Sequence, residues 1–343
     1  MSGYLADLTD EKCIEKYRLD REGVSFFAEK LRSHPLMKRS TKAGLPAEGQ
    51  LLIALRYFAT GNSISSLQDT HKGFCDLSHG AVHKCILNVS EALASFSRTF
   101  LTFPTSDEEI VEIKRKFFKY GGFPGIIGAI DGTVMKIKAP STNEEAYVGR
   151  KEGHFINCQV ICDMNQRFLD AVVRWPGSTH DSTIWYHSGA KGVVEELVRH
   201  KGPTFKGWLI GDSGYSQREI MMVPLAEPQT AQEKRYNEAH KKCRCVIERT
   251  IGVLKSRFRC LCRKSGGGIQ YHEETAVNII TSCMVLHNYC RSRNMDFPID
   301  KDVADMIKKE QEMKVIRKSS ENMSDSVELR LGQIARAAVI KSF

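Results

Sequence analysis

Two short apolar runs in the middle of the chain each lead into an aspartate, and a glutamate lies further along inside a helical pattern. The aspartates are Asp131 and Asp212, and the glutamate is Glu248. Two carboxylates on strands and one on a helix can converge to hold a pair of divalent ions for phosphodiester chemistry. This feature predicts a mixed α/β core that carries an acidic site.

Length and charge set the outer limits of what the chain can do. Its 343 residues are enough for two domains with separate cores, and its net charge of +9 favours a polyanionic partner. It contains no run of about 18 apolar residues, and its N-terminus lacks the pattern of a secretory signal. We therefore expect a soluble protein that does not bind membranes.

Changes in residue pattern divide the chain into four predicted regions. These are a polar, partly helical N-terminal extension (1–45), a helical domain (46–120), an α/β domain (121–292) and a charged C-terminal tail with an amphipathic stretch (293–343). The glycine-rich segment Gly121–Gly125 separates the helical part from the strands and is expected to act as a hinge.

The helical domain has the outline of a helix-turn-helix. An apolar helical face ends at Gly61, Ser63 can cap a short second helix that Gly73 ends, and Ser78 can cap a longer third helix. Similar patterns also occur in plain packing modules. If the third helix binds DNA, the contacts would come from its exposed face, which carries His79, His83 and Lys84.

The α/β domain is predicted from alternating apolar patterns. The expected strands are Ile126–Lys138, broken near Asp131, a hairpin of Phe155–Cys162 and Phe168–Trp175, and Trp208–Gly211, with a loop-rich stretch at 216–240 and helices at 241–258 and Ala276–Tyr289. This order, with aspartates on two strands and a glutamate on a late helix, suits a ribonuclease-H-like core. Oxygen-only ligation would favour Mg²⁺ or Mn²⁺.

Each acidic residue also has an ordinary interpretation. An aspartate after a strand often begins a turn, and Glu248 could simply pair with Arg244 or Arg249. The eleven cysteines are expected to be reduced, buried thiols. The closest approach to a zinc pattern is two Cys-x-Cys pairs, but zinc sites usually space paired cysteines by two to four residues. These pairs are Cys243 with Cys245 and Cys260 with Cys262.

Several longer motifs, taken in order, resemble the PIF/Harbinger DDE transposases and the Harbinger-derived nucleases of animals. They are Ala129–Thr133, Tyr147–Lys151, Trp175–Ser182, Leu209–Tyr215, Val246–Phe258 and Leu286–Asn288. The resemblance spans about residues 45 to 292. It implies a ribonuclease-H-like DDE catalytic domain whose metal-binding triad is Asp131, Asp212 and Glu248.

The resemblance also implies an activity and partners. It implies a metal-dependent enzyme that cleaves transposon ends at terminal inverted repeats and joins the freed 3′-hydroxyl to target DNA. The alternative is a domesticated nuclease, or an adaptor that binds DNA or protein without transposing. A Myb-like DNA-binding partner, a homo-oligomer and a nuclear location are expected, with cytoplasmic protein when the partner is missing.

Asp181 competes with Asp212 for the second metal position. Asp181 follows His180 at the start of a helix, where an aspartate usually serves as a cap. Both residues could instead support the metal site. Asp212 is predicted as the ligand because its strand is expected to lie beside the strand of Asp131.

Basic residues near the late helix could hold DNA phosphates, although most exposed lysines and arginines are only solvated. The candidates are Arg150, Lys151, Arg244, Arg249, Lys255 and Arg257.

Overall fold

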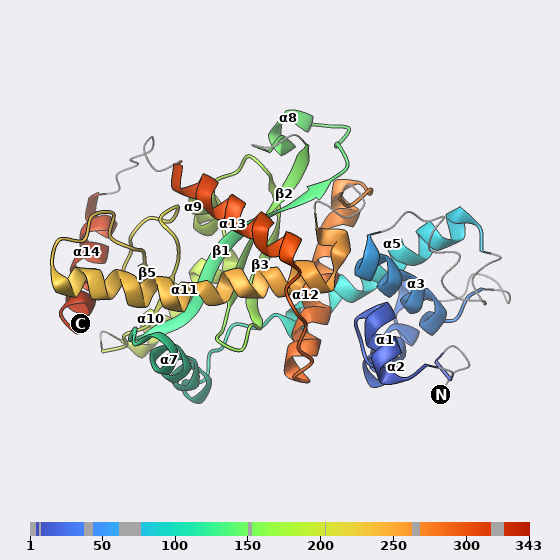
Figure 1. Cartoon of the computed structure of the whole chain (residues 1–343), viewed down its shortest axis with the longest axis horizontal. Coiled ribbons are helices and arrows are strands. Elements are labelled where there is room, and N and C mark those ends of the chain that lie inside the picture. Colours follow the sequence, from blue (N-terminus) through green and yellow to red (C-terminus); the bar gives the residue numbers. More distant parts are fainter. Residues whose placement is uncertain are drawn as a thin grey trace.

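A five-stranded mixed sheet lies at the centre of the protein (Figure 1). The strand order is β3-β2-β1-β4-β5. Antiparallel pairing joins β1, β2 and β3, whereas β4 and β5 run parallel to β1. The strands are β1 Ile126–Ile137, β2 His154–Cys162, β3 Phe168–Pro176, β4 Trp208–Ile210 and β5 Met221–Met222. The predicted hairpin and the predicted placement of the Trp208 strand beside the strand of Asp131 are therefore confirmed, and these two neighbours run parallel.

The computed structural model describes residues 5–6, 8–37, 44–61, 77–149, 153–202, 204–262, 268–316 and 326–343. Its helices are α1 Asp10–Tyr17, α2 Arg21–Arg32, η1 Pro35–Met37, α3 Ala47–Thr60, α5 His79–Ser95, α6 Ser97–Phe100, α7 Asp107–Gly121, α8 Glu144–Tyr147, α9 Asp181–Tyr186, α10 Gly189–Lys201, α11 Ala231–Arg257, η2 Arg259–Leu261, α12 Glu273–Ser292, α13 Lys301–Ile316 and α14 Ser326–Ile340. Among these described helices, none is long and apolar enough to cross a membrane.

Strand β1 is the central element because it pairs with β2 on one side and β4 on the other. Asp131 sits in the middle of β1, opposite Val160 of β2. The predicted break near Asp131 is wrong: the strand continues through it, and the irregularity lies between Ile126 and Gly128 in the pairing with β4. At Asp131 itself β1 pairs with β2 alone, because the pairing with β4 ends at Ala129.

Helix α11 is longer than predicted. It begins at Ala231 because Thr230 and Glu233 form a capping box, in which each side chain bonds the other's backbone. The polar stretch before residue 241 was expected to be a loop, and this expectation is wrong for 231–240. The C-terminal half of α11 packs against β1 and β2 through a buried apolar face that includes Val246, Ile247 and Leu254.

Helix α12 joins the N-terminal helices to the sheet. It packs against α5 on one side and β3 on the other, as its place between the blue helices and the sheet in Figure 1 shows. Its Asn288 side chain bonds both backbone groups of Phe168 (2.8 and 2.7 Å) and the carbonyl of Phe100 (2.8 Å). Ser282 donates to the Ser90 carbonyl of α5 at 2.8 Å. Both contacts are buried.

The helix-turn-helix prediction is only partly covered by the structure. Helices α3 and α5 are present, but the predicted short helix and turn from Ser63 to Gly73 lie outside the described residues. His79, His83 and Lys84 are exposed on α5. The His83 ring stacks on Tyr271 with ring centres 4.9 Å apart. A DNA-binding face on α5 remains a prediction.

The C-terminal tail forms two helices. The predicted amphipathic stretch from Val327 to Val339 is helix α14, whereas α13 has no counterpart among the predicted elements. Helix α14 packs beside β5, and the Gly332 carbonyl accepts a hydrogen bond from Gln217 at 3.0 Å.

The Asn288 contacts lead to a test of the fold. Asn288→Ala should lower the free energy of unfolding by about 1–3 kcal/mol, because the buried backbone groups of Phe168 and the partly buried carbonyl of Phe100 lose their partner. Glu274→Ala, at an exposed position on the same helix, should change it by less than about 0.5 kcal/mol. Urea unfolding followed by circular dichroism measures both values. Equal losses in the two variants would contradict this role of Asn288.

Candidate metal centre

Three aspartates meet at one edge of the sheet. Ligand oxygens of Asp131, Asp181 and Asp212 lie within 4.8 Å of one another. They come from three elements: the middle of β1, the first turn of α9 and the loop that follows β4. Asp131 is only 2% exposed. Three carboxylates at this spacing repel each other unless cations compensate their charge.

Asp181 does not have the role that was predicted for it. His180 occupies the N-cap position of α9 and makes no side-chain capping bond, and Asp181 is the first helical residue. The Asp181 carboxylate lies directly over Gly132, where a Cβ atom would stand 2.2 Å from its Oδ1. The capping role for Asp181 is therefore wrong. Glycine at position 132 allows the carboxylate to approach the backbone of β1.

Two amide side chains of β2 fix the start of α9. Asn157 donates to Oδ1 of Asp181 at 3.0 Å and to the Thr179 carbonyl at 2.9 Å. Gln159 donates to the Asp181 carbonyl at 2.9 Å. The sequence alone did not indicate this role, because polar residues that alternate with apolar ones on a strand are usually only solvent-facing. Together they orient Asp181 toward Asp131.

A buried tyrosine, Tyr215, lies close to the three aspartates. Gln159 also donates to the hydroxyl of Tyr215 at 3.2 Å. Burial, and then the charges of Asp181, Asp131 and Asp212, raise the pKa of Tyr215 well above its usual value. Tyr215 therefore remains a neutral phenol at any working pH. Asp212 begins the turn to Tyr215, and its Oδ1 accepts from the Gly214 amide at 2.8 Å.

Glu248 lies on the far side of an arginine from this cluster. Arg244 pairs with Glu248 one turn along α11, and its Nη1 is 3.8 Å from Oδ2 of Asp131. Burial opposes the charge of Arg244, but Asp131, Glu248 and Asp212 together raise its pKa. Arg244 is thus a fixed counter-charge shared by two elements. Its side chain is only 15% exposed, and a phosphate contact by Arg244 stays a prediction.

The other residues that were predicted to contact DNA differ in how exposed their side chains are. Lys255 and Arg257 are fully buried: Lys255 donates to the Val134 carbonyl, and Arg257 donates to the Arg18 and Met295 carbonyls. In this structure neither side chain is exposed, so neither is open to DNA as it was predicted to be. Arg249 is exposed. Arg150 and Lys151 lie outside the described residues.

The four cysteines considered for zinc are free thiols. Cys243, Cys260 and Cys262 are buried and Cys245 is half-buried. The Sγ atoms of Cys260 and Cys283 are 3.9 Å apart. Burial raises the pKa of Cys243 to about 11.

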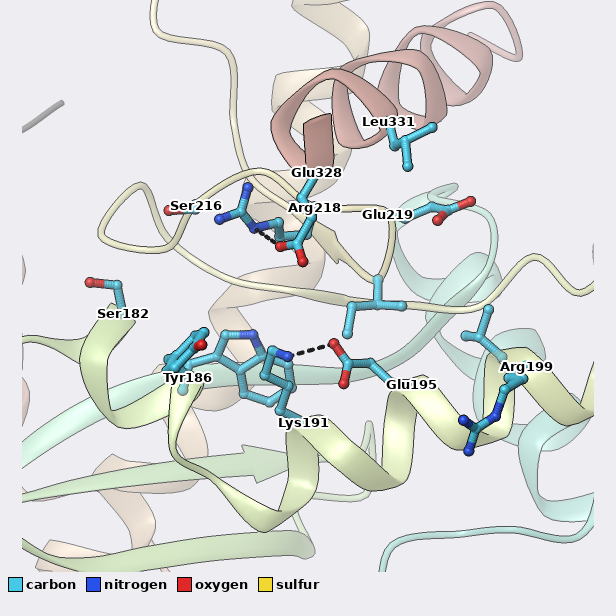
Figure 2. Close-up of a pocket in the computed structure, with 13 residues that line it drawn as sticks. Ser182, Tyr186, Lys191, Glu195, Arg199, Ser216, Arg218, Glu219, Glu328 and Leu331 are labelled. Atoms are coloured by element: carbon cyan, nitrogen blue, oxygen red, sulfur yellow. Dashed lines mark hydrogen bonds and ion pairs between the residues drawn. The ribbon is translucent and has the colours of Figure 1, made fainter. Parts of the chain in front are cut away.

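A cavity of about 290 Å³ lies close to the aspartate cluster in sequence. Its lining includes Ser182, which follows Asp181, and Ser216, which follows Tyr215. Figure 2 shows it between α10 and the loop before β5, with ion pairs from Lys191 to Glu195 and from Arg218 to Glu328 of α14. Its charged lining is balanced, with three bases and three acids: Lys191, Arg199, Arg218, Glu195, Glu219 and Glu328. A balanced lining distinguishes this cavity from the acidic cluster.

His240 holds α11 against the strand ends. Its Nε2 lies 3.1 Å from the Met222 carbonyl of β5. Burial lowers the pKa of His240 to about 4. The ring is therefore neutral at pH 7, and its contact helps to keep Arg244, one turn further on, beside Asp131.

Comparison with known proteins identifies the family. Residues 130–288 match a family described as "DDE superfamily endonuclease". The chain is 34% identical over 292 residues to a mouse protein and to a human protein that both carry the name "Putative nuclease HARBI1". The match covers 85% of this chain and 81% of each relative. The chain belongs to the Harbinger DDE family.

More distant relatives occur in plants. An Arabidopsis thaliana protein named "Protein ALP1-like" is 23% identical over 299 residues, which cover 82% of this chain and 71% of that protein. No solved structure gives a significant match. Membership of the DDE family confirms the predicted ribonuclease-H-like core and the nuclease class of the protein.

The DDE family implies a bound divalent metal, and the residues of this chain fit one. The cluster offers only carboxylate oxygens, which are the donors that hard divalent cations prefer. The three aspartates come within 4.8 Å of one another, although like charges repel. A cation between them would offset this repulsion.

The His240 contact predicts how stability depends on pH. The folded pKa of about 4 lies below the ordinary value of 6.5, so the unfolded chain takes up the proton first. This contribution to stability is complete above pH 6.5 and is lost as the pH falls toward 4. His287, whose pKa burial lowers to about 3, acts in the same direction.

Urea unfolding midpoints measured between pH 7.5 and 4.5 test this dependence. The unmodified protein should lose stability across the interval, and His240→Gln should lose clearly less because one of the two buried imidazoles is gone. Identical pH profiles for the two proteins would contradict the account.

Proposed function

We propose that this protein is a Mg²⁺- or Mn²⁺-dependent DNA endonuclease that cleaves transposon ends and joins the resulting 3′-hydroxyl to target DNA. The observation that supports it most is the convergence of three aspartate oxygens within 4.8 Å on a DDE-family core. The donors that the described residues bring together there are carboxylate oxygens, and such donors favour Mg²⁺ or Mn²⁺ over zinc.

Asp131, Asp181 and Asp212 are the residues that would hold the metal. A divalent ion in such a site lowers the pKa of water and neutralises charge that develops on phosphate oxygens. The chain's own contribution is to fix the donors. Strand β1 holds Asp131, Asn157 orients Asp181 through the bond to Oδ1, and the turn to Tyr215 holds Asp212.

Glu248 belongs to the same site through Arg244. The arginine is shared between Asp131 and Glu248 and limits the repulsion between them. Beside an anionic phosphodiester, the guanidinium would also stabilise negative charge on the substrate. Glu248 therefore stays beside the site as the third member of the acidic triad that the resemblance implies, whereas the carboxylates grouped for a metal are those of Asp131, Asp181 and Asp212.

The finer parts of the proposal rest on the family resemblance. They are recognition of terminal inverted repeats, joining to target DNA, a Myb-like DNA-binding partner, a homo-oligomer and action in the nucleus. The net charge of +9 supports DNA as the polyanion. A domesticated nuclease that cuts without joining is the alternative, and it would use the same aspartates.

Nicking of supercoiled plasmid with Mg²⁺ tests the metal site. Asp131→Asn, Asp181→Asn and Asp212→Asn should each reduce cleavage by about 100-fold or more, since several kcal/mol of charge stabilisation are lost. Their melting temperatures without metal should be equal or higher, because repulsion is reduced. Glu108→Gln, which changes an exposed acid on α7, is the control. Undiminished cleavage in EDTA would contradict the proposal.

Joining is tested separately with an oligonucleotide that carries matched terminal inverted repeats and a plasmid target. The proposal expects a covalent product in which the 3′-hydroxyl of the oligonucleotide is linked to the plasmid, and loss of that product with Asp212→Asn. Cleavage of the repeat end with no joined product would favour the domesticated nuclease.

A further inference from the structure

Helix α13 closes the acidic site on the side of Glu248. A narrow cleft there is lined from the core by Asp131, Gly132, Thr133, Glu248 and Ile251, and from α13 by Ile307 and Glu310. The cleft has room for about 10 Å³, enough for about one water molecule. A phosphodiester group is several times larger. DNA cannot enter this side of the site while α13 is in place.

A buried ion pair joins α13 to the site. Lys255 of α11 is 0% exposed, and its Nζ is 3.5 Å from a carboxylate oxygen of Glu310. The same Nζ donates to the Val134 carbonyl of β1 at 3.3 Å. A buried ammonium group is very unfavourable without an anion beside it. Lys255 therefore needs a negative partner, and Glu310 supplies it.

The contact made by Glu310 is separate from the anchor of α13. At the start of the helix, Arg259 pairs with Asp300 at 2.6 Å and with Asp302 at 3.0 Å. Val303 and Met306 are buried in the next turns. Glu310 lies beyond this anchor, so its contact can be lost while the start of α13 stays attached. Further along, α13 packs beside α11, as Figure 1 shows.

We propose that Lys255 is a binding site for a backbone phosphate of the DNA substrate, and that the Glu310 carboxylate occupies it in the closed protein. A carboxylate and a phosphate are both anions with oxygen acceptors, so a DNA phosphate can replace the Glu310 carboxylate in the ion pair with Lys255. DNA binding displaces the part of α13 that carries Glu310 and opens the cleft beside Asp131. This inference rests on the proposed function, because it takes DNA as the substrate.

The position of Lys255 suits a phosphate close to the one that is cut. Lys255 lies seven residues after Glu248 on α11, which is two helical turns and therefore the same face. The separation along the helix is about 10 Å. This is the rise of about three nucleotides along one DNA strand. One strand can therefore reach the acidic cluster and Lys255 together.

DNA affinity, measured in EDTA so that no cleavage occurs, tests the site. Fluorescence anisotropy with a labelled duplex should give binding about 10-fold tighter for Glu310→Gln, an effect typical of coupled sites. The matched control is Asp305→Asn, which removes the same charge from an exposed position on the same helix. The control should change affinity by less than about twofold, because general charge effects on DNA binding fall off with distance.

A double-mutant cycle assigns the effect to Lys255. Lys255→Met should weaken binding, and adding Glu310→Gln to it should give no gain. Equal effects of Glu310→Gln and Asp305→Asn, or a gain that persists in Lys255→Met, would overturn the phosphate site. If Lys255→Met does not fold, the comparison with Asp305→Asn still decides. If neither the unmodified protein nor any of the variants binds DNA, the proposed function itself is overturned.

Discussion

Repulsion among carboxylates around Asp131 is the constraint on which the rest of the structure depends. Asp131 is nearly fully buried in a central strand, and two other aspartates come within 4.8 Å of it. Such a cluster is stable only if cations offset its charge. Arg244 supplies one cation from the protein, and the donor set leaves room for a divalent metal. The neutral hydroxyl of Tyr215 adds no further charge.

Most of the fold serves to hold this cluster. Pairing with β2 fixes the backbone of Asp131, and the amides of Asn157 and Gln159 place Asp181 from that same strand. His240 holds α11 against β5, and this contact helps to keep Arg244 and its partner Glu248 beside Asp131. Substitutions far from the aspartates can therefore alter the site through these contacts.

The sequence predicted the hairpin, the strand of Asp212 beside that of Asp131 and the family, because these depend on local patterns and ordered motifs. It did not reveal the position of Asp181, because convergence over Gly132 depends on how α9 returns across the sheet. The exposure of Lys255 was also mispredicted. Its partner Glu310 lies on α13, a helix whose contact with α11 no local pattern indicates. The start of α11 was missed because its first turns are polar and its capping box lies well before the apolar face.

Anomalous diffraction from crystals grown with Mn²⁺ tests the central claim most directly. The account predicts a manganese peak in contact with carboxylate oxygens of Asp131, Asp181 and Asp212, at the short distances typical of oxygen ligands to hard cations. A protein that binds Mn²⁺ only elsewhere, or a peak that touches Asp131 and Glu248 but neither of the other two aspartates, would contradict it.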